Sequence, residues 1–210
     1  MLTEPELVSV ILPADPISGP RQGSWTYDDY AALPDDGHRY EIMNGVLLMA
    51  PAPGGAHQDS VLRFALHLFN HVEVVGLGKV RLAPFDVMLT AGRVVQPDVL
   101  VVLNENLGKL TPSRMIGAPD LVIEIMSPGT ATYDRLSKYE AYEQAEVPEY
   151  WIANPRTQSV EVLILQDGKY HSQGIFRGSD ALPSQVAPGI ANVPVSAKSA
   201  YYKLRLRVPC

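Results

Sequence analysis

Apolar residues repeat at helical spacing in two parts of the chain. Over residues 57–72 they form one stripe, which comprises Val61, Leu62, Ala65, Leu66, Leu68, Phe69 and Val72. A second amphipathic stretch predicts a helix over about 132–146, ending before Pro148. Thr26 is a candidate N-cap for a short helix that begins at Tyr27.

Shorter apolar runs predict β-strands. Three of them lie between the two long helices, near 80–89, 94–103 and 120–127, and a fourth covers 149–153. Two further stretches predict hairpins: residues 39–49 turn at Asn44-Gly45, and residues 160–176 turn at 166–169.

The order helix, three strands, helix, strand is typical of an α/β or α+β domain built on a central mixed sheet. The two helices are expected to cover the two faces of that sheet, with the hairpins added at its ends. The first 23 residues have little periodicity and contain Pro5, Pro13, Pro16 and Pro20, which favours an extended or mobile arm. Residues 24–210 are therefore expected to form a single domain.

Composition narrows the class of protein. Hydrophobic residues make up 46% of the 210 positions and charged residues 19%, which is enough apolar material for a folded core. The net charge of −6 counts against a general polyanion binder, although a local basic face or a bound metal would offset it. With Cys210 as the sole cysteine, no disulfide forms within one chain. No apolar run approaches the roughly 18 residues of a membrane span, and the start lacks signal-peptide features, so we expect a cytoplasmic protein.

Single carboxylates interrupt several of the apolar strands. Asp98 opens the run 97–103, Glu124 lies within 121–126, and Asp86 interrupts 85–89. A carboxylate in a buried strand needs a cation or hydrogen bonds to offset its desolvation. We therefore expect three neighbouring strands to direct one acid each into a shared site. Asp120 shares a face with Glu124 but lies about 13 Å away along the strand, too far to bind the same ion.

A lysine on the following helix is placed to complete this site. Asp134 and Lys138 are four residues apart and share a helical face, from which the Lys138 ammonium could reach Glu124. Two acids provide hard oxygen ligands that suit Mg²⁺, with Mn²⁺ as an alternative. Such a metal lowers the pKa of a bound water and stabilises charge on a phosphodiester, and a nearby lysine would orient that water.

Structural roles compete with this interpretation. Asp86 alone could be a satisfied ion pair or a cap, and Asp134–Lys138 could be a solvated helix pair. Asp98, Glu124 and Lys138 together could be a salt-bridge cluster without chemistry. Asp120 follows Pro119 and is expected to start its strand.

Several short motifs, taken in order, resemble a known family. They are Tyr40-Glu41-Ile42-Met43-Asn44-Gly45, His57-Gln58, Pro97-Asp98, Glu124-Ile125-Met126-Ser127-Pro128, Asp134 with Lys138-Tyr139, and Val147-Pro148-Glu149-Tyr150-Trp151. Their order and spacing over roughly 25–180 resemble the Uma-type restriction endonucleases of the PD-(D/E)XK nuclease superfamily.

The resemblance implies a restriction-endonuclease-like core and Mg²⁺-dependent cleavage of DNA. It makes Asp98 the first acid of the motif and Glu124 the second. Met126 stands where the simple motif has lysine, so the lysine is assigned to Lys138 on the following helix. Glu41 would be a further ligand, directly or through water, and His57 a phosphate contact, a base or a helix-start residue.

Three functional hypotheses follow. The first is a Mg²⁺-dependent endonuclease that acts on DNA, with Asp98, Glu124 and Lys138 as catalytic residues and Glu41, His57, Asp86 and Asp134 in support; a homodimer is expected because duplex cleavage needs two sites. The second is a catalytically silent module that binds DNA or protein, which the net charge favours. A hydrolase acting on RNA or nucleotides is a third.

Two other features of the sequence were weighed as candidate sites. The pair His67/His71 lacks the glutamate of a zincin motif. The alternating stretch 201–208 is expected to be an edge strand with a basic face.

Overall fold

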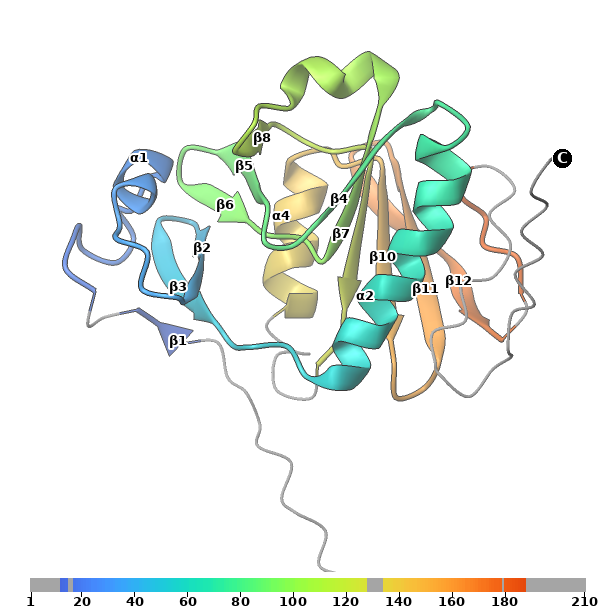
Figure 1. The fold of residues 1–210 in the computed structure, drawn as a ribbon, viewed down its shortest axis with the longest axis horizontal. Helices are drawn as coiled ribbons and strands as arrows, with labels where there is room; N and C mark the ends of the chain where they lie inside the picture. The colour runs from blue at the N-terminus through green and yellow to red at the C-terminus, as the bar shows by residue number, and fades with distance from the viewer. Residues whose placement is uncertain (1–11, 15–16, 128–133, 179, 188–210) are drawn as a thin grey trace, which may run out of the picture.

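The computed structural model describes residues 12–14, 17–127, 134–178 and 180–187, and their strands form two six-stranded mixed sheets (Figure 1). The N-terminal sheet has the order β1-β3-β2-β6-β5-β8, with β1 at Leu12–Pro13, β2 at Arg39–Met43, β3 at Val46–Ala50, β5 at Asp86–Thr90, β6 at Arg93–Val95 and β8 at Arg114–Ile116. The central sheet has the order β12-β11-β10-β9-β7-β4, with β4 at Gly78–Leu82, β7 at Val99–Leu103, β9 at Leu121–Ile125, β10 at Glu149–Asn154, β11 at Ser159–Gln166 and β12 at Lys169–Arg177.

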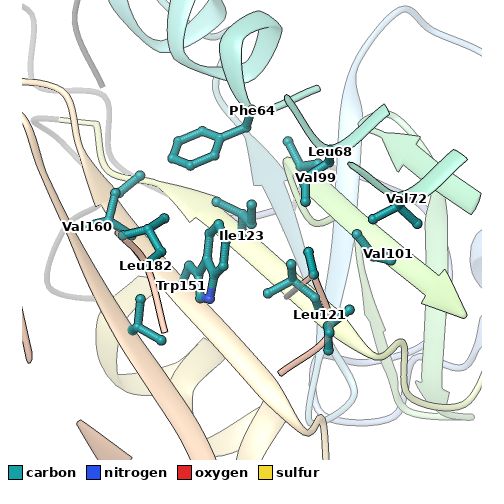
Figure 2. Close-up of a cluster of buried hydrophobic side chains, with 14 of the residues drawn as sticks. Phe64, Leu68, Val72, Val99, Val101, Leu121, Ile123, Trp151, Val160 and Leu182 are labelled. Atoms are coloured by element: carbon teal, nitrogen blue, oxygen red, sulfur yellow. The ribbon is translucent and has the colours of Figure 1, made fainter. Parts of the chain in front are cut away.

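Helices cover both faces of the central sheet, as predicted. On one face lie α2 (Gly55–Leu68) and the π-helical turn η1 (Phe69–Glu73); on the other lie the π-helical turn η3 (Asp134–Lys138) and α4 (Tyr139–Gln144). A hydrophobic core lies on each face of the central sheet, and successive residues of β9 face the two cores in turn. Leu121 and Ile123 pack with α2, whereas Val122 packs with α4. Figure 2 shows the α2 side, where Phe64 lies against Trp151. β9 is therefore the buried centre of the domain.

The predicted apolar stripe of the first long helix is correct for Leu68 and Val72, which are fully buried, and wrong for three other members. Leu62, Leu66 and Phe69 are 58%, 54% and 49% exposed, whereas Phe64 is fully buried. Apolar residues occur on most sides of this helix, so periodicity alone does not choose the inward face. The sheet selects the face that carries Phe64, Leu68 and Val72, whose side chains fill the space over β7, β9 and β10.

Two predicted strands are each divided between the sheets. The stretch 80–89 forms β4 and β5, separated at Pro84, and 94–103 forms β6 and β7, separated at Pro97. Proline supplies no N–H to a ladder, which favours a break at these positions. The expectation that Asp86 lies on the strand beside Asp98 is therefore wrong, because β5 belongs to the N-terminal sheet and β7 to the central sheet.

The predicted turns and caps agree with the structure. Thr26 and Asp29 form a capping box at α1 (Tyr27–Ala31). Asn44 and Gly45 have φ of 53° and 76°, the conformation of a tight hairpin turn between β2 and β3. A Cβ on Gly45 would lie 2.5 Å from the carbonyl oxygen of Gly23, so this position excludes a side chain. Asp167-Gly168 makes the corresponding turn between β11 and β12.

The ends of the chain are described only in part. Within the predicted N-terminal arm, β1 pairs with β3 and Ala14 is buried in the N-terminal sheet. The strand predicted at 201–208 lies outside the described residues. A 3₁₀ segment, η2 (Asn104–Lys109), connects β7 to β8. In the described part of the chain, no helix combines the length and apolarity that a bilayer crossing requires.

Candidate active site

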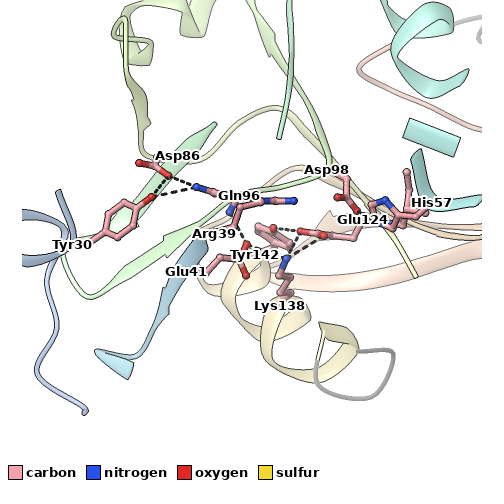
Figure 3. A network of polar contacts seen from close by, with 11 residues as sticks. Tyr30, Arg39, Glu41, His57, Asp86, Gln96, Asp98, Glu124, Lys138 and Tyr142 are labelled. Atoms are coloured by element: carbon pink, nitrogen blue, oxygen red, sulfur yellow. Dashed lines mark hydrogen bonds and ion pairs between the residues drawn. The ribbon is translucent and has the colours of Figure 1, made fainter. Parts of the chain in front are cut away.

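Five ionisable side chains predicted from the sequence come together where the two sheets meet (Figure 3). Glu41 comes from β2 of the N-terminal sheet, Glu124 from β9, and Lys138 from the end of η3. Asp98 immediately precedes β7, and His57 lies in the first turn of α2. Glu41, Asp98, Glu124 and Lys138 are all buried, with residue exposures of 5–7%.

The pairing of β7 with β9 places Asp98 beside Glu124. Val99 lies opposite Ile123 in this antiparallel pair. The backbone N–H of Ile125, the residue after Glu124, donates a 2.8 Å hydrogen bond to Asp98 Oδ2. On the helix side, His57 Nε2 lies 3.1 Å from the same oxygen. Asp98 is thus held by a strand on one side and by α2 on the other.

Lys138 lies between two carboxylates that come from different sheets. Its Nζ is 3.1 and 3.2 Å from the two carboxylate oxygens of Glu124, and 3.2 Å from Glu41 Oε1. These two carboxylates replace part of the hydration that the Lys138 ammonium loses on burial. Lys138 therefore reaches Glu124 from the helix, as the sequence predicted.

Two residues at the site were missed by the sequence analysis. Tyr142 donates a hydrogen bond of 2.5 Å from its hydroxyl to Glu124 Oε1. The backbone N–H of Gln96 donates one of 2.7 Å to Glu41 Oε1. A signal existed for Tyr142, which lies four residues after Lys138 on the same helical face. Gln96 offered only its position before Pro97-Asp98.

The remaining acidic candidates lie outside this group. Asp86 accepts hydrogen bonds from the Gln96 side-chain amide at 2.9 Å and from the Tyr30 hydroxyl at 3.1 Å, so it contacts the site only through Gln96. Asp120 accepts from the Leu103 backbone N–H, at 2.7 Å, as expected of a structural residue. Asp134 begins η3, and its side chain is outside the described residues.

The histidine pair on α2 is likewise separate from the site. The rings of His67 and His71 are stacked with centroids 6.2 Å apart, and His71 Nδ1 contacts the His67 carbonyl at 2.8 Å. Both rings therefore have contacts that account for them without a metal.

The donor set fits a hard divalent cation. Asp98 and Glu124 are adjacent carboxylates, and within the described ranges no group of three or more His, Cys, Asp or Glu side chains is arranged to hold a metal ion. Mg²⁺ is commonly held by one or two carboxylates and keeps several waters, so two acids suffice.

Replacing Tyr142 with phenylalanine tests the buried hydrogen bond through its pH dependence. Burial, followed by the nearby Glu124 and Glu41 charges, raises the pKa of Tyr142 well above its usual value of 10. The folded state therefore binds this proton more tightly than the unfolded state. The contribution of this proton to the free energy of unfolding is fully present below pH 10. Above pH 10 it falls by about 1.4 kcal/mol per pH unit for one tyrosine.

We expect Tyr142→Phe to be less stable than the wild type at pH 7 by about 1–3 kcal/mol, because Glu124 loses a buried donor. We expect it to lose stability less steeply between pH 10 and 11. Urea unfolding at pH 7, 10 and 11 measures both effects, and parallel pH profiles for the two proteins would contradict the prediction.

Comparison with known proteins gives a family and a fold. A family model described as "Uma2: Putative restriction endonuclease" matches residues 27–196. Among solved structures, a putative nuclease of the DUF820 group from Anabaena variabilis superposes with a TM-score of 0.64 at 21% sequence identity, covering 77% of this chain and 90% of that one. No curated protein matches the chain. The predicted restriction-endonuclease-like fold class, α+β with mixed sheets, is confirmed.

Proposed function

The chain belongs to the Uma2 family, described as putative restriction endonucleases, and from this premise we propose that it is a Mg²⁺-dependent endonuclease that hydrolyses DNA phosphodiester bonds. The observation that carries the proposal is the meeting of Asp98, Glu124 and Lys138 in one buried cluster, although they come from three separate elements. Buried charges are uncommon unless they are paired or functional, and here Asp98, just before β7, lies beside Glu124 of the adjacent β9.

Each residue of the cluster has a chemical role in this proposal. Asp98 and Glu124 would hold the ion, which would lower the pKa of a bound water and stabilise charge on the phosphodiester. The Lys138 ammonium, already 3.1 Å from Glu124, donates a hydrogen bond to the attacking water or to a phosphate oxygen next to that carboxylate. Tyr142 fixes the Glu124 carboxylate by its hydroxyl, and His57 fixes Asp98 from α2.

DNA as the substrate and a homodimer as the active form belong to the same proposal. The family description supports a restriction-type activity, and such an activity on a duplex must cut two strands. Two-fold dimers are the commonest symmetric assemblies and would present two equivalent sites. Sedimentation equilibrium at micromolar concentration tests the dimer independently of cleavage.

Cleavage of supercoiled plasmid with added Mg²⁺ or Mn²⁺ tests the activity. We expect nicked and then linear DNA with either ion, and none once EDTA removes the metal. Single-stranded DNA and RNA of equal length, run in parallel, distinguish a DNA endonuclease from a hydrolase of RNA. A protein that binds plasmid but leaves it intact with both metals would support the silent binding module instead.

A further inference from the structure

Glu41 is the one acid of the cluster that comes from the N-terminal sheet. It is 5% exposed, on β2. Its Oε1 accepts the Gln96 N–H at 2.7 Å and lies 3.2 Å from Lys138 Nζ. The same oxygen therefore joins a backbone amide of its own sheet to an ammonium carried by the helix on the central sheet.

Glu41 lies apart from Asp98, the acid that is adjacent to Glu124. Figure 3 shows Glu41 and Asp98 on opposite sides of Glu124, with Lys138 contacting Glu41 and Glu124. Asp98 is tied to the β9 backbone beside Glu124, whereas Glu41 is tied to Gln96. An ion shared by Asp98 and Glu124 would lie on the side of Glu124 away from Glu41.

We propose that Glu41 is a positioning residue that holds Lys138 in the site and is not a metal ligand. This inference rests on the proposed function, because it concerns what happens to Lys138 when a divalent ion binds Glu124. It replaces the role of further metal ligand, direct or through water, that the resemblance implied for Glu41, and it places the new role at a contact between the two sheets.

The physical reason is a competition between cations for Glu124. In the structure both oxygens of Glu124 contact Lys138. A divalent ion on the same carboxylate would weaken its attraction for the ammonium and would repel the ammonium, and these effects are strong at a buried site. Glu41, whose Oε1 lies 3.2 Å from Lys138 Nζ, would then keep the ammonium in the site.

The hydrogen bonds around Gln96 make Glu41 a rigid anchor. The Gln96 side chain donates to Asp86 at 2.9 Å and accepts from Arg39 Nε at 3.1 Å. The backbone N–H that holds Glu41 is thus fixed by side chains on β2 and β5. Asp86, predicted as a supporting residue, would act through this chain of contacts and not at the metal.

Glu41→Gln tests the proposal because glutamine keeps the shape and removes the charge. We expect Mn²⁺ affinity, measured by electron paramagnetic resonance without DNA, to stay within about threefold of the wild type, and kcat to fall about 10- to 100-fold through misplacement of Lys138. Asp98→Asn is the matched control, for which Mn²⁺ affinity should fall by at least about tenfold. Equal losses of Mn²⁺ affinity in the two variants would overturn the proposal, as would a Glu41→Gln variant with unchanged kcat.

A spectroscopic measurement follows Lys138 directly. The ¹⁵Nζ signal of a buried, hydrogen-bonded lysine is protected from exchange, and its absence in Lys138→Met assigns it. With Mg²⁺ bound, we expect the signal to persist in the wild type and to be lost in Glu41→Gln. Persistence in the variant would overturn the proposal. Should Glu41→Gln not fold, Glu41→Asp, which keeps the charge but shortens the side chain, should retain Mn²⁺ affinity with reduced kcat.

These measurements separate the two proposals. Mn²⁺ binding and the lysine signal require no DNA, so a wild type that binds metal but cleaves nothing refutes the endonuclease and still tests Glu41 through the lysine signal. A wild type that binds no Mn²⁺ refutes both.

Discussion

Asp98→Asn and Glu124→Gln are each expected to lower metal-dependent DNA cleavage by at least about 1000-fold. The metal contributes several kcal/mol of transition-state stabilisation, and each variant removes one of the two carboxylates that would hold it. Both replacements keep the size of the side chain. In Glu124→Gln the amide oxygen can still accept from Lys138 and Tyr142, so the loss should arise from the ion and not from unfolding.

Asp120→Asn provides the matched control for this prediction. Asp120 is also buried, at 6% exposure, and precedes the strand that carries Glu124, but it contacts Leu103 and Asn106 instead of the cluster. We expect this variant to cleave at the wild-type rate per folded molecule, measured as initial rates of plasmid nicking beside thermal unfolding. Comparable losses in all three variants would indicate a general effect on folding and remove the support for the assigned ligands.

Trp151→Ala is expected to be the most destabilising single change in the core, at about 3–5 kcal/mol. Trp151 is fully buried on β10, where its ring packs 6.2 Å from Phe64 of α2, measured between centroids. Its indole Nε1 also donates a 2.7 Å hydrogen bond to buried Glu149. Alanine would leave a cavity between the sheet and α2 and remove a donor from a buried carboxylate.

Urea unfolding of Trp151→Ala and Leu62→Ala measures this contribution. Leu62 lies on the same helix as Phe64 but is 58% exposed, so its truncation should change stability by less than about 0.5 kcal/mol. At about 2–4 °C per kcal/mol for a domain of this size, the tryptophan variant should also melt roughly 10 °C lower. A loss below about 1 kcal/mol would contradict the packing that we describe.

Local patterns in the sequence were sufficient to predict most elements. Asn44-Gly45 and Asp167-Gly168 occupy conformations that few other residues favour, so the hairpins could be placed from two residues each. The same holds for Thr26, whose side chain caps α1. Assigning strands to sheets required information that these patterns lack. Nothing near Pro84 or Pro97 indicates that the segments on the two sides of each proline join different sheets.

The residues of the candidate site that could be predicted are those whose charge interrupts a run of apolar, buried positions. Asp98 and Glu124 stand out because each interrupts an apolar run, and Lys138 because the family motif needs a cation. Asp86 carries the same signal, yet it lies in the N-terminal sheet and binds Gln96 and Tyr30. Gln96 acts on Glu41 through its backbone N–H, which every residue except proline possesses, so its identity gave no indication of the contact.

The parallel pairing of β9 with β10 links the formation of the site to the progress of translation. In a nascent chain that ends before Glu149, β9 would have no neighbour on the side opposite β7, and Tyr142 would lack Tyr150, whose ring lies 5.0 Å away between centroids. Glu124 and Tyr142 would then lack the part of their packing that β10 and β11 supply. A ribosome-bound or prematurely terminated fragment that ends before Glu149 would thus lack the complete packing around Glu124.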